Sequence, residues 1–260
     1  MPSKLDWSNL EKDYKKLGTI EKVAEKYGCR KETVSLWKKK LGILSNLDNY
    51  HRYRINTDFL KKWTSELAYF IGFTAADGNL MPYKKGNSRG GGVRWEIKED
   101  DEELLKKFKK LLKSEHPIVR YKRYNSCGLR IYNKEIYDFF IFLDIKPNKT
   151  FNLRPIRKIP QHLLNHFVRG YFDGDGWISY NKNKAQRCYA SGITCASKDF
   201  LDWISKIIPT KGGSLFKREN YYTLSYGRLD TLRLGEFIYK DSNICLNRKY
   251  KRFKLAGVKI

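Results

Sequence analysis

The sequence contains one arrangement of residues twice, and this repeat constrains the fold more than any other feature. One mostly apolar segment ends in AADG and a later one ends in DGDG, so that Asp77 and Asp175 lie 98 positions apart (175 − 77). Downstream of each, a strand-like stretch precedes a helical one, in which Leu104 matches Phe200 at an offset of 96 (200 − 104). This period is too long for a solenoid and predicts two similar halves related by pseudo-twofold symmetry.

Within each half, the pattern predicts a helix, two strands, a second helix, two strands and a third helix. Residues 93–98 alternate between apolar and polar side chains, which indicates a strand with one buried side. The third helices are expected near residues 133–144 and 228–240, and each half then ends in an extended basic segment, KPNKTFNL or CLNRKYKRF. The predicted fold class is α+β, with two αββαββα halves that each hold an antiparallel sheet, plus a small all-α domain.

The two segments that open the halves, SELAYFIGFTAADG and PQHLLNHFVRGYFDGDG, are apolar around most of their circumference, as buried helices are. Small residues four apart make a flat face on each: Gly72 and Ala76 on the first helix, Gly170 and Gly174 on the second. Two flat faces allow close packing of two helices. Gly78 and Gly176 stand where C-terminal glycines end helices.

If these helices pack side by side, Asp77 and Asp175 emerge together at their C-terminal ends, where the helix dipoles are negative. Two carboxylates at that point repel each other, so the arrangement costs free energy unless a cation is present. A single Asp-Gly pair usually marks a turn. Two equivalent copies at helix ends predict a divalent metal site.

The charge of the chain indicates its partner. Its 260 residues include 53 Lys and Arg against 28 Asp and Glu, which gives a net charge of +25. Such an excess predicts a polyanion, either nucleic acid or an anionic membrane. The sequence has no apolar run long enough to span a membrane, no apolar N-terminal signal region and no CxxC pair among its five cysteines. We therefore expect an intracellular, cytoplasmic protein with reduced thiols.

Residues 1–45 predict a separate helical domain, followed by a linker at 46–60 and by the two halves at 61–158 and 159–260. Ala24, Gly28, Val34 and Trp37 stand where a helix-turn-helix needs a small residue, a turn and apolar anchors. The third helix of this unit would present a basic face to DNA, formed by Arg30, Lys31, Thr33 and Lys38. The alternative is an ordinary packing unit with a solvated basic face.

The nonapeptides FIGFTAADG (70–78) and VRGYFDGDG (168–176) resemble the two signatures of the LAGLIDADG homing endonucleases. The stretches ITCASKDFLDWI and IYKDSNICLNRKYKRF are also similar to that family, and the resemblance covers residues 60–255. It implies a monomeric enzyme whose paired helices join two halves, each with a sheet that enters the DNA major groove. Such an enzyme cleaves both strands of a long pseudo-palindromic site across the minor groove and leaves 3′ overhangs.

The resemblance also implies site residues. Asp77 and Asp175 match the metal-binding acidic residues of the family, and we expect the site to include their neighbours Ala76 and Gly174. The expected cofactor is Mg²⁺, with Mn²⁺ able to substitute and Ca²⁺ able to bind without supporting cleavage. Asp173 occupies a position that varies in the family, so only a local capping role is expected for it.

The family further uses one lysine per half near the scissile phosphates. Lys149 and Lys249 lie in the terminal segments of their halves and are the candidates, although Arg248 and Lys251 compete with the second. A lysine there could polarise a metal-bound water or stabilise negative charge on the phosphate.

Further basic residues are expected to contact double-stranded DNA. In the strands, Arg94 and Lys98 should face outward, as should Arg120 and Lys122, because they alternate with apolar residues. The other candidates are Arg52 and Arg54 in the linker, Lys84, Lys85 and Arg130 in the first half, and Lys182, Lys184, Arg187, Lys217 and Arg218 in the second. Arginine is suited to guanine, but each residue could equally contact phosphate.

Other classes of protein stay open. A catalytically inactive descendant would act as a DNA-binding regulator, and the family also contains intron RNA maturases. An intein is not expected, since the chain begins with MPSK and ends with GVKI, without splicing-type residues. No protein partner is implied. The sequence favours a sequence-specific, metal-dependent endonuclease for double-stranded DNA.

Overall fold

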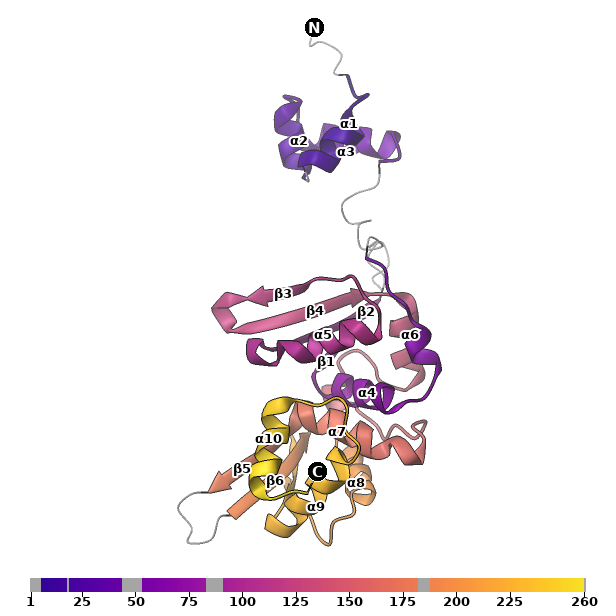
Figure 1. The fold of residues 1–260 in the computed structure, drawn as a ribbon. Helices are drawn as coiled ribbons and strands as arrows, with labels where there is room; N and C mark the ends of the chain where they lie inside the picture. The colour runs from indigo at the N-terminus through magenta and orange to yellow at the C-terminus, as the bar shows by residue number, and fades with distance from the viewer. Residues whose placement is uncertain (1–5, 18, 44–52, 83–90, 182–187, 260) are drawn as a thin grey trace. The chain divides into compact units, whose positions relative to one another are not determined.

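The computed structural model describes residues 6–17, 19–43, 53–82, 91–181 and 188–259, which form two compact units. Described residues up to Tyr53 belong to the first unit, and those from Arg54 onward belong to the second (Figure 1). Among the described helices, none combines the length and the apolar character that crossing a membrane requires.

The first unit is a three-helix packing of α1 (Leu10–Leu17), α2 (Ile20–Lys26) and α3 (Lys31–Lys40). Its small core holds Val23, Ala24 and Val34, against which Trp37 packs. The turn between α2 and α3 uses Gly28 at φ +59°, a left-handed conformation that suits glycine. These contacts match the expected anchors, and the DNA-binding role of the unit stays a prediction.

One expectation for this unit is wrong. Lys38 does not face outward with Arg30 and Lys31, because its side chain is buried and its ammonium lies 3.8 Å from the centroid of the Tyr14 ring. Lys38 follows the buried Val34 by four residues, and residues at this spacing share one face of a helix.

The second unit contains the predicted repeat. Its first half runs α4 (Ser65–Asp77), β1 (Gly78–Met81), β2 (Gly92–Lys98), α5 (Glu102–Leu111), β3 (Ile118–Tyr121), β4 (Ser126–Tyr132) and α6 (Lys134–Phe142). Its second half runs α7 (Leu164–Asp175), β5 (Gly176–Asn181), β6 (Cys188–Cys195), α8 (Lys198–Ile207), β7 (Ser214–Lys217), β8 (Tyr222–Tyr226) and α9 (Arg228–Tyr239). The two antiparallel sheets have the equivalent orders β1-β2-β4-β3 and β5-β6-β8-β7. The α+β prediction with αββαββα halves is confirmed.

The ends of the two halves differ from the expectation. The basic segment of the second half is not extended, because Asn247–Ala256 forms a further helix, α10. In the first half, the corresponding segment holds only a short 3-10 turn at Lys149–Phe151. At the start of the unit, residues 54–60 are packed rather than linker-like: Asn56 donates its N–H to the carbonyl of Leu112 (2.8 Å).

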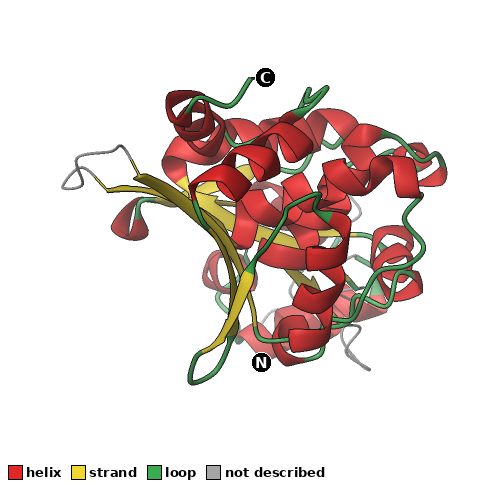
Figure 2. Cartoon of the chain, turned by 90° about the horizontal axis from the view of Figure 1, so that it is seen from below, coloured by secondary structure: helices red, strands yellow, loops and turns green. Residues whose placement is uncertain are grey.

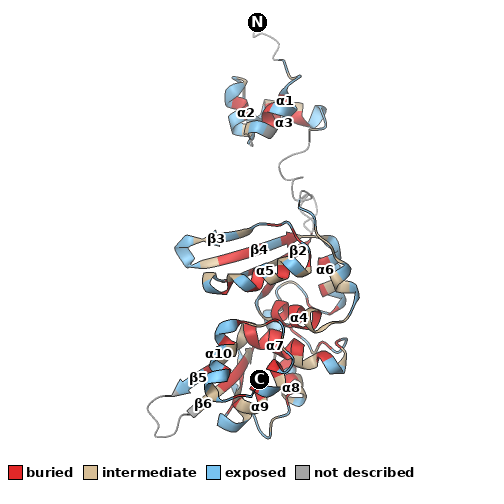
Figure 3. Cartoon of the chain, in the orientation of Figure 1, coloured by how far each residue is buried: buried red, intermediate tan, exposed pale blue. Residues whose placement is uncertain are grey.

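Most helices gather on one side of the strands, so that each sheet has a helix-covered face and an outer face (Figure 2). The covered faces and the helices share one hydrophobic core, in which Trp95 packs against Phe70 and Phe108 with ring centroids 5.3 and 5.4 Å apart. Buried residues concentrate in α4 and α7, which lie together between the two sheets (Figures 1 and 3). The helix pair therefore joins the two halves.

Glycines set how closely α4 and α7 approach. A Cβ built on Gly72 would lie 2.0 Å from the carbonyl oxygen of Phe167, and one on Gly170 would lie 2.1 Å from that of Tyr69. These distances are far below a van der Waals contact, so the backbones meet only because both positions lack a side chain. The predicted flat faces of small residues are confirmed.

Replacing Gly170 with alanine is therefore expected to lower the free energy of unfolding by about 3 kcal/mol, because the added methyl group must displace the backbone of the facing helix. Chemical unfolding of the full chain measures this. Gly227→Ala is the matched control, since its Cβ would meet nothing within 4 Å. Equal stability of the two variants would show that the helices can separate without cost.

Candidate functional site at the ends of the paired helices

The two helices end at their acidic residues. Asp77 is the last residue of α4, and Asp175 is the last residue of α7. The following residues, Gly78 and Gly176, are in extended conformations with φ −75° and −91°, so neither is a left-handed cap. Glycine is needed for space instead, since a Cβ on Gly78 would lie 2.6 Å from the carbonyl oxygen of Thr74. The chain can thus turn directly from each helix into a strand.

The two carboxylates lie close enough to affect each other. Burial and the negative charge of Asp77 together raise the pKa of Asp175 to about 6, against the positive charges of Lys149 and Lys249 and a hydrogen bond from Tyr171. Asp77 is exposed at the surface of the site, yet desolvation by the surrounding protein also raises its pKa. Both groups therefore resist ionisation in the protein without a bound cation.

A lysine reaches the end of each helix. Lys149 donates to the carbonyl oxygens of Ala76 (3.0 Å) and Gly78 (2.5 Å). Lys249, which is buried, donates to the equivalent carbonyls of Gly174 (3.2 Å) and Gly176 (2.6 Å). The structure thus brings both predicted lysines to the predicted carboxylates, each in its own half.

The lysines lie in a poorly solvated environment. Burial lowers the pKa of Lys249 to about 8, although the nearby carboxylates oppose that shift. The pKa of Lys149 is also lowered by burial, while Asp175 and Asp77 raise it. The two ammonium groups offset part of the negative charge at the helix ends, including that of the helix dipoles.

The donor set fits a hard divalent cation. The carboxylate of Asp77 lies beside Gly174, because a Cβ built on Gly174 would lie 3.3 Å from the Asp77 carboxyl carbon, so both acidic residues face one region. Among the described residues, no group of three or more His, Cys, Asp or Glu could hold a metal ion. Binding through two carboxylates plus water is typical of Mg²⁺. The carbonyls of Ala76 and Gly174 already accept lysine hydrogen bonds, so their role as metal ligands stays a prediction.

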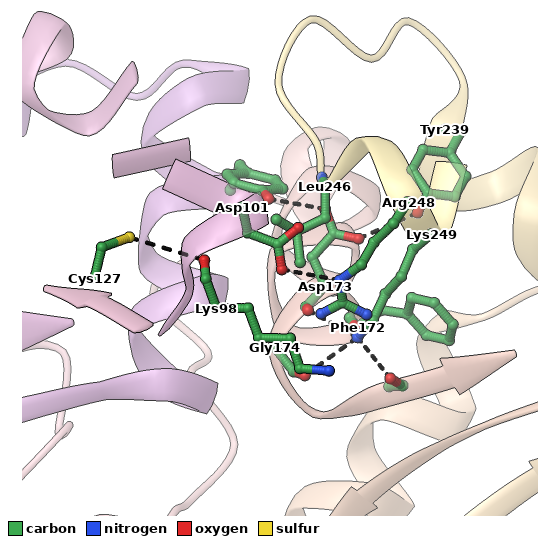
Figure 4. A network of polar contacts seen from close by, with 12 residues as sticks. Lys98, Asp101, Cys127, Phe172, Asp173, Gly174, Tyr239, Leu246, Arg248 and Lys249 are labelled. Atoms are coloured by element: carbon green, nitrogen blue, oxygen red, sulfur yellow. Dashed lines mark hydrogen bonds and ion pairs between the residues drawn. The ribbon is translucent and has the colours of Figure 1, made fainter. Parts of the chain in front are cut away.

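A neighbouring acidic residue has a different environment. Asp173 is fully buried and accepts hydrogen bonds from the hydroxyl groups of Tyr69 (2.8 Å) and Tyr239 (3.1 Å) and from the N–H of Leu246 (2.7 Å; Figure 4). It therefore links α4, α7 and the residue that precedes α10. The expectation of a purely local capping role is wrong, because these partners come from distant segments.

A second polar contact joins the two halves beside the site. Arg248 Nε donates to the Asp101 carboxylate at 2.9 Å (Figure 4). Both residues line an open groove of about 720 Å³, together with Asp77, Asn79, Arg94 and Lys98. From the sequence, Arg248 was expected only as a competitor of Lys249. The pairing of Arg248 with Asp101 spans 147 positions of the chain, so no local pattern indicates it.

A family model identifies residues 163–210, from the start of α7 to the end of α8, as a LAGLIDADG-like domain. Solved structures extend the likeness in fold to both halves. The LAGLIDADG meganuclease I-AabMI bound to uncleaved DNA is 16% identical with a TM-score of 0.54, and the comparison covers 73% of this chain and 88% of that one.

Two further structures are similar in fold. I-SmaMI bound to an uncleaved DNA target in the presence of calcium ions gives a TM-score of 0.53 at 14% identity, covering 76% of this chain and 92% of that chain. The LAGLIDADG homing endonuclease I-GzeII in complex with its DNA target gives 0.52 at 12% identity, covering 73% and 88%. At such identities, the likeness shows the fold.

One curated relative is a probable translation initiation factor IF-2 of Methanocaldococcus jannaschii, which is 28% identical over 185 residues. The match covers 68% of this chain but 15% of that protein. The chain thus resembles one segment of a much longer protein.

The outer faces of the two sheets are set by strand register. In β2, Arg94 and Lys98 face outward as expected, since Trp95 and its alternate neighbours are buried. Arg130 of β4 lies opposite Arg94 and shares this face.

On the edge strands the expected orientation is wrong. Arg120 lies opposite the buried Cys127 and therefore projects from the helix-covered face, where it pairs with Glu102 (2.5 Å). Lys217, opposite Tyr222, likewise lies on the face of Leu215 rather than on the outer face. Alternation fixes which residues share a face, but pairing with the next strand decides which face that is.

The other basic candidates have the following positions. Lys122 lies in a 3-10 turn after β3, and Arg218 follows β7, where both are exposed. The backbone of Arg54 is held by Glu115, whose carboxylate accepts from its N–H (3.1 Å). Arg52, Lys84, Lys85, Lys182, Lys184 and Arg187 lie outside the described residues. Their contact with DNA stays a prediction.

The raised pKa of Asp175 makes the stability of the protein depend on pH. Between its ordinary value of 3.8 and about 6, the unfolded chain ionises this group while the folded chain resists ionisation, so stability falls as pH rises. A shift of this size corresponds to a loss of about 2–3 kcal/mol, complete above pH 6. Asp175→Asn should therefore stabilise the metal-free protein more at pH 7 than at pH 4.5 in thermal unfolding. An equal effect at both pH values would contradict this electrostatic origin.

Proposed function

We propose that this protein is a sequence-specific, Mg²⁺-dependent homing endonuclease that cleaves both strands of DNA and leaves 3′ overhangs. The observation that carries the proposal is the pair of carboxylates at the ends of α4 and α7, each accompanied by a lysine from its own half. Repelling carboxylates whose pKa values are raised by burial are poorly suited to a structural role and well suited to hold a cation. Because both signature helices lie in one chain, a monomer supplies the whole site.

The net charge of +25 and the DNA-bound state of the solved structures with this fold support DNA as the polyanion. One acidic residue per half suits a reaction on two strands, because pseudo-twofold symmetry relates the halves as it relates the strands of a duplex. A site at the helix ends would then cleave a long, pseudo-palindromic target across the minor groove between the two sheets.

The chain's own residues would act as follows. Asp77 and Asp175 would hold Mg²⁺, which when bound supplies a Lewis acid and an activated water. Lys149 and Lys249 keep positive charge at the helix ends and would stabilise the charge that develops on each phosphate. Arg248, oriented by Asp101 at the edge of the groove, would bind a neighbouring phosphate.

The test is to incubate the full chain and Mg²⁺ with a randomised duplex library and to sequence the cut ends. The expected result is a defined set of sites with staggered cuts and 3′ overhangs, without cutting when a chelator is present. Specific binding without cutting would indicate a DNA-binding regulator instead. Preferential binding of RNA would indicate a maturase.

The three-helix first unit is proposed as a second DNA contact, through the exposed Arg30 and Lys31 at the start of α3. Deleting residues 1–45 is expected to shorten the DNA footprint on one side and to weaken binding about tenfold or more, since several phosphate contacts are lost. Footprinting and salt titration measure this effect. An unchanged footprint and affinity would show that the first unit does not contact DNA.

A further inference from the structure

The outer faces of the two sheets have different chemistry despite their equivalent topology. Register places twelve residues on the outer face of the first sheet: Asn79, Met81, Gly92, Arg94, Glu96, Lys98, Val119, Tyr121, Ser126, Gly128, Arg130 and Tyr132. Three of the twelve are cations and one is an anion. Arg94 and Arg130 lie directly opposite each other on β2 and β4. This face therefore presents two guanidinium groups side by side, close to the groove at Asp77.

The corresponding face of the second sheet has nine described residues: Trp177, Ser179, Ala190, Gly192, Thr194, Ser214, Phe216, Thr223 and Ser225. None of these nine is charged. Residues on the other side of the same strands, such as Ile193 and Leu224, are buried in the core, so the nine face away from the helices. Instead of cations, this face carries hydroxyl groups, small residues and two large rings.

Neither ring is buried in the core: Phe216 is exposed and Trp177 is half-buried. Phe216 is 47% exposed on the edge strand β7. The indole of Trp177 lies across β6, because a Cβ built on Gly192 would meet its Cε2 and Cζ2 atoms at 2.8 Å. Gly192 thus provides the space in which the indole lies flat against the sheet. A flat apolar surface with hydroxyl groups around it is suited to methyl groups and not to phosphates.

We propose that the two sheets read chemically different half-sites, a guanine-containing half at the first sheet and a thymine-rich half at the second. This inference rests on the proposed function, because it assumes that both outer faces enter the major groove. Arginine forms bidentate hydrogen bonds with guanine N7 and O6, whereas apolar side chains contact the C5 methyl group of thymine. Arg94 and Arg130 are the residues that read guanine, and Trp177 and Phe216 are those that contact thymine methyl groups.

The experiment has two stages. The full chain first selects duplexes from a randomised library in Ca²⁺, and the bound pool is sequenced. Single bases of a selected site are then replaced with analogues, and affinity is measured. Uracil in place of thymine removes only the methyl group, and 7-deazaguanine removes only the N7 acceptor.

The expected result is an asymmetric site. Uracil should weaken binding about fourfold per contacted thymine in one half, which corresponds to the burial of a methyl group. 7-Deazaguanine should weaken binding about fivefold or more in the other half. Phe216→Ala should abolish the uracil effect at the thymine that this ring contacts, and Arg94→Ala the deazaguanine effect at one guanine of the other half, while the positions read by Trp177 and Arg130 keep theirs. Phe142→Ala is the control, because that exposed ring lies on α6 and outside both sheets.

Results that overturn this inference can be distinguished from results that overturn the proposed function. Two halves with the same guanine content, or uracil substitutions without effect in either half, would overturn the inference while leaving the endonuclease proposal intact. Failure to enrich any duplex would instead overturn the proposed function and, with it, this inference. The analogue measurements use the unaltered chain, so they decide the matter even if a variant fails to fold.

Discussion

Replacing Asp77 or Asp175 with asparagine is expected to reduce double-strand cleavage at least about a thousandfold, because each change removes a charge that we propose to hold the cation, an interaction of several kcal/mol. Binding of the DNA target should persist, since the outer faces of the sheets do not change. Cleavage and binding of one selected duplex are measured in Mg²⁺ and in Ca²⁺, respectively.

Asp202→Asn is the matched control for these variants. Asp202 pairs with Lys198 at 2.6 Å on the surface of α8, away from the ends of α4 and α7. Its replacement with asparagine should therefore leave cleavage unchanged. Cutting at the normal rate by either the Asp77 or the Asp175 variant would remove that residue from the metal site. Loss of binding together with loss of cleavage would show that the carboxylate has a structural role instead.

Asp173→Ala is expected to lower the free energy of unfolding by about 3–5 kcal/mol, the largest effect on stability that we predict for a single substitution. The change leaves two tyrosine hydroxyl groups and the Leu246 N–H without their acceptor in a fully buried region. Chemical unfolding of the full chain measures it.

The other half offers a natural comparison, because the position equivalent to Asp173 is Ala75, which is buried without such a network. Tyr69→Phe should cost much less, about 1 kcal/mol, since Asp173 keeps two of its three donors. A small loss for Asp173→Ala with abolished cleavage would contradict this assignment and place the carboxylate in the chemistry.

Asp173 also matters for the site because its partners set the position of Lys249. Its carboxylate holds the N–H of Leu246, the residue that precedes α10, and its backbone carbonyl accepts from Lys249 (2.7 Å). In the first half, Lys149 comes from a short 3-10 turn rather than from a helix anchored in this way. The two sites are therefore equivalent in their reactive groups and different in their support.

Several features could be predicted from the sequence because their signals are local. The repeat of Asp77 and Asp175 predicted two halves, and small residues four apart on each helix predicted the close contact that Gly72 and Gly170 make. The resemblance to the homing endonucleases, together with their place in each terminal segment, indicated Lys149 and Lys249, and both reach the helix ends. Helical and strand periods repeat within a few residues, so the order of apolar and polar residues along the chain is enough to predict them.

Other features depend on which distant segments meet, and only the tertiary structure decided them. The alternation of β3 and β7 gave two faces, but pairing with β4 and β8 placed Arg120 and Lys217 on the helix-covered side. The Asp101–Arg248 ion pair and the acceptor role of Asp173 likewise join residues separated by much of the chain. An amino-acid pattern specifies the period of an element and the chemistry of its side chains. Register, and the partners of a buried charge, are fixed only when the elements pack together.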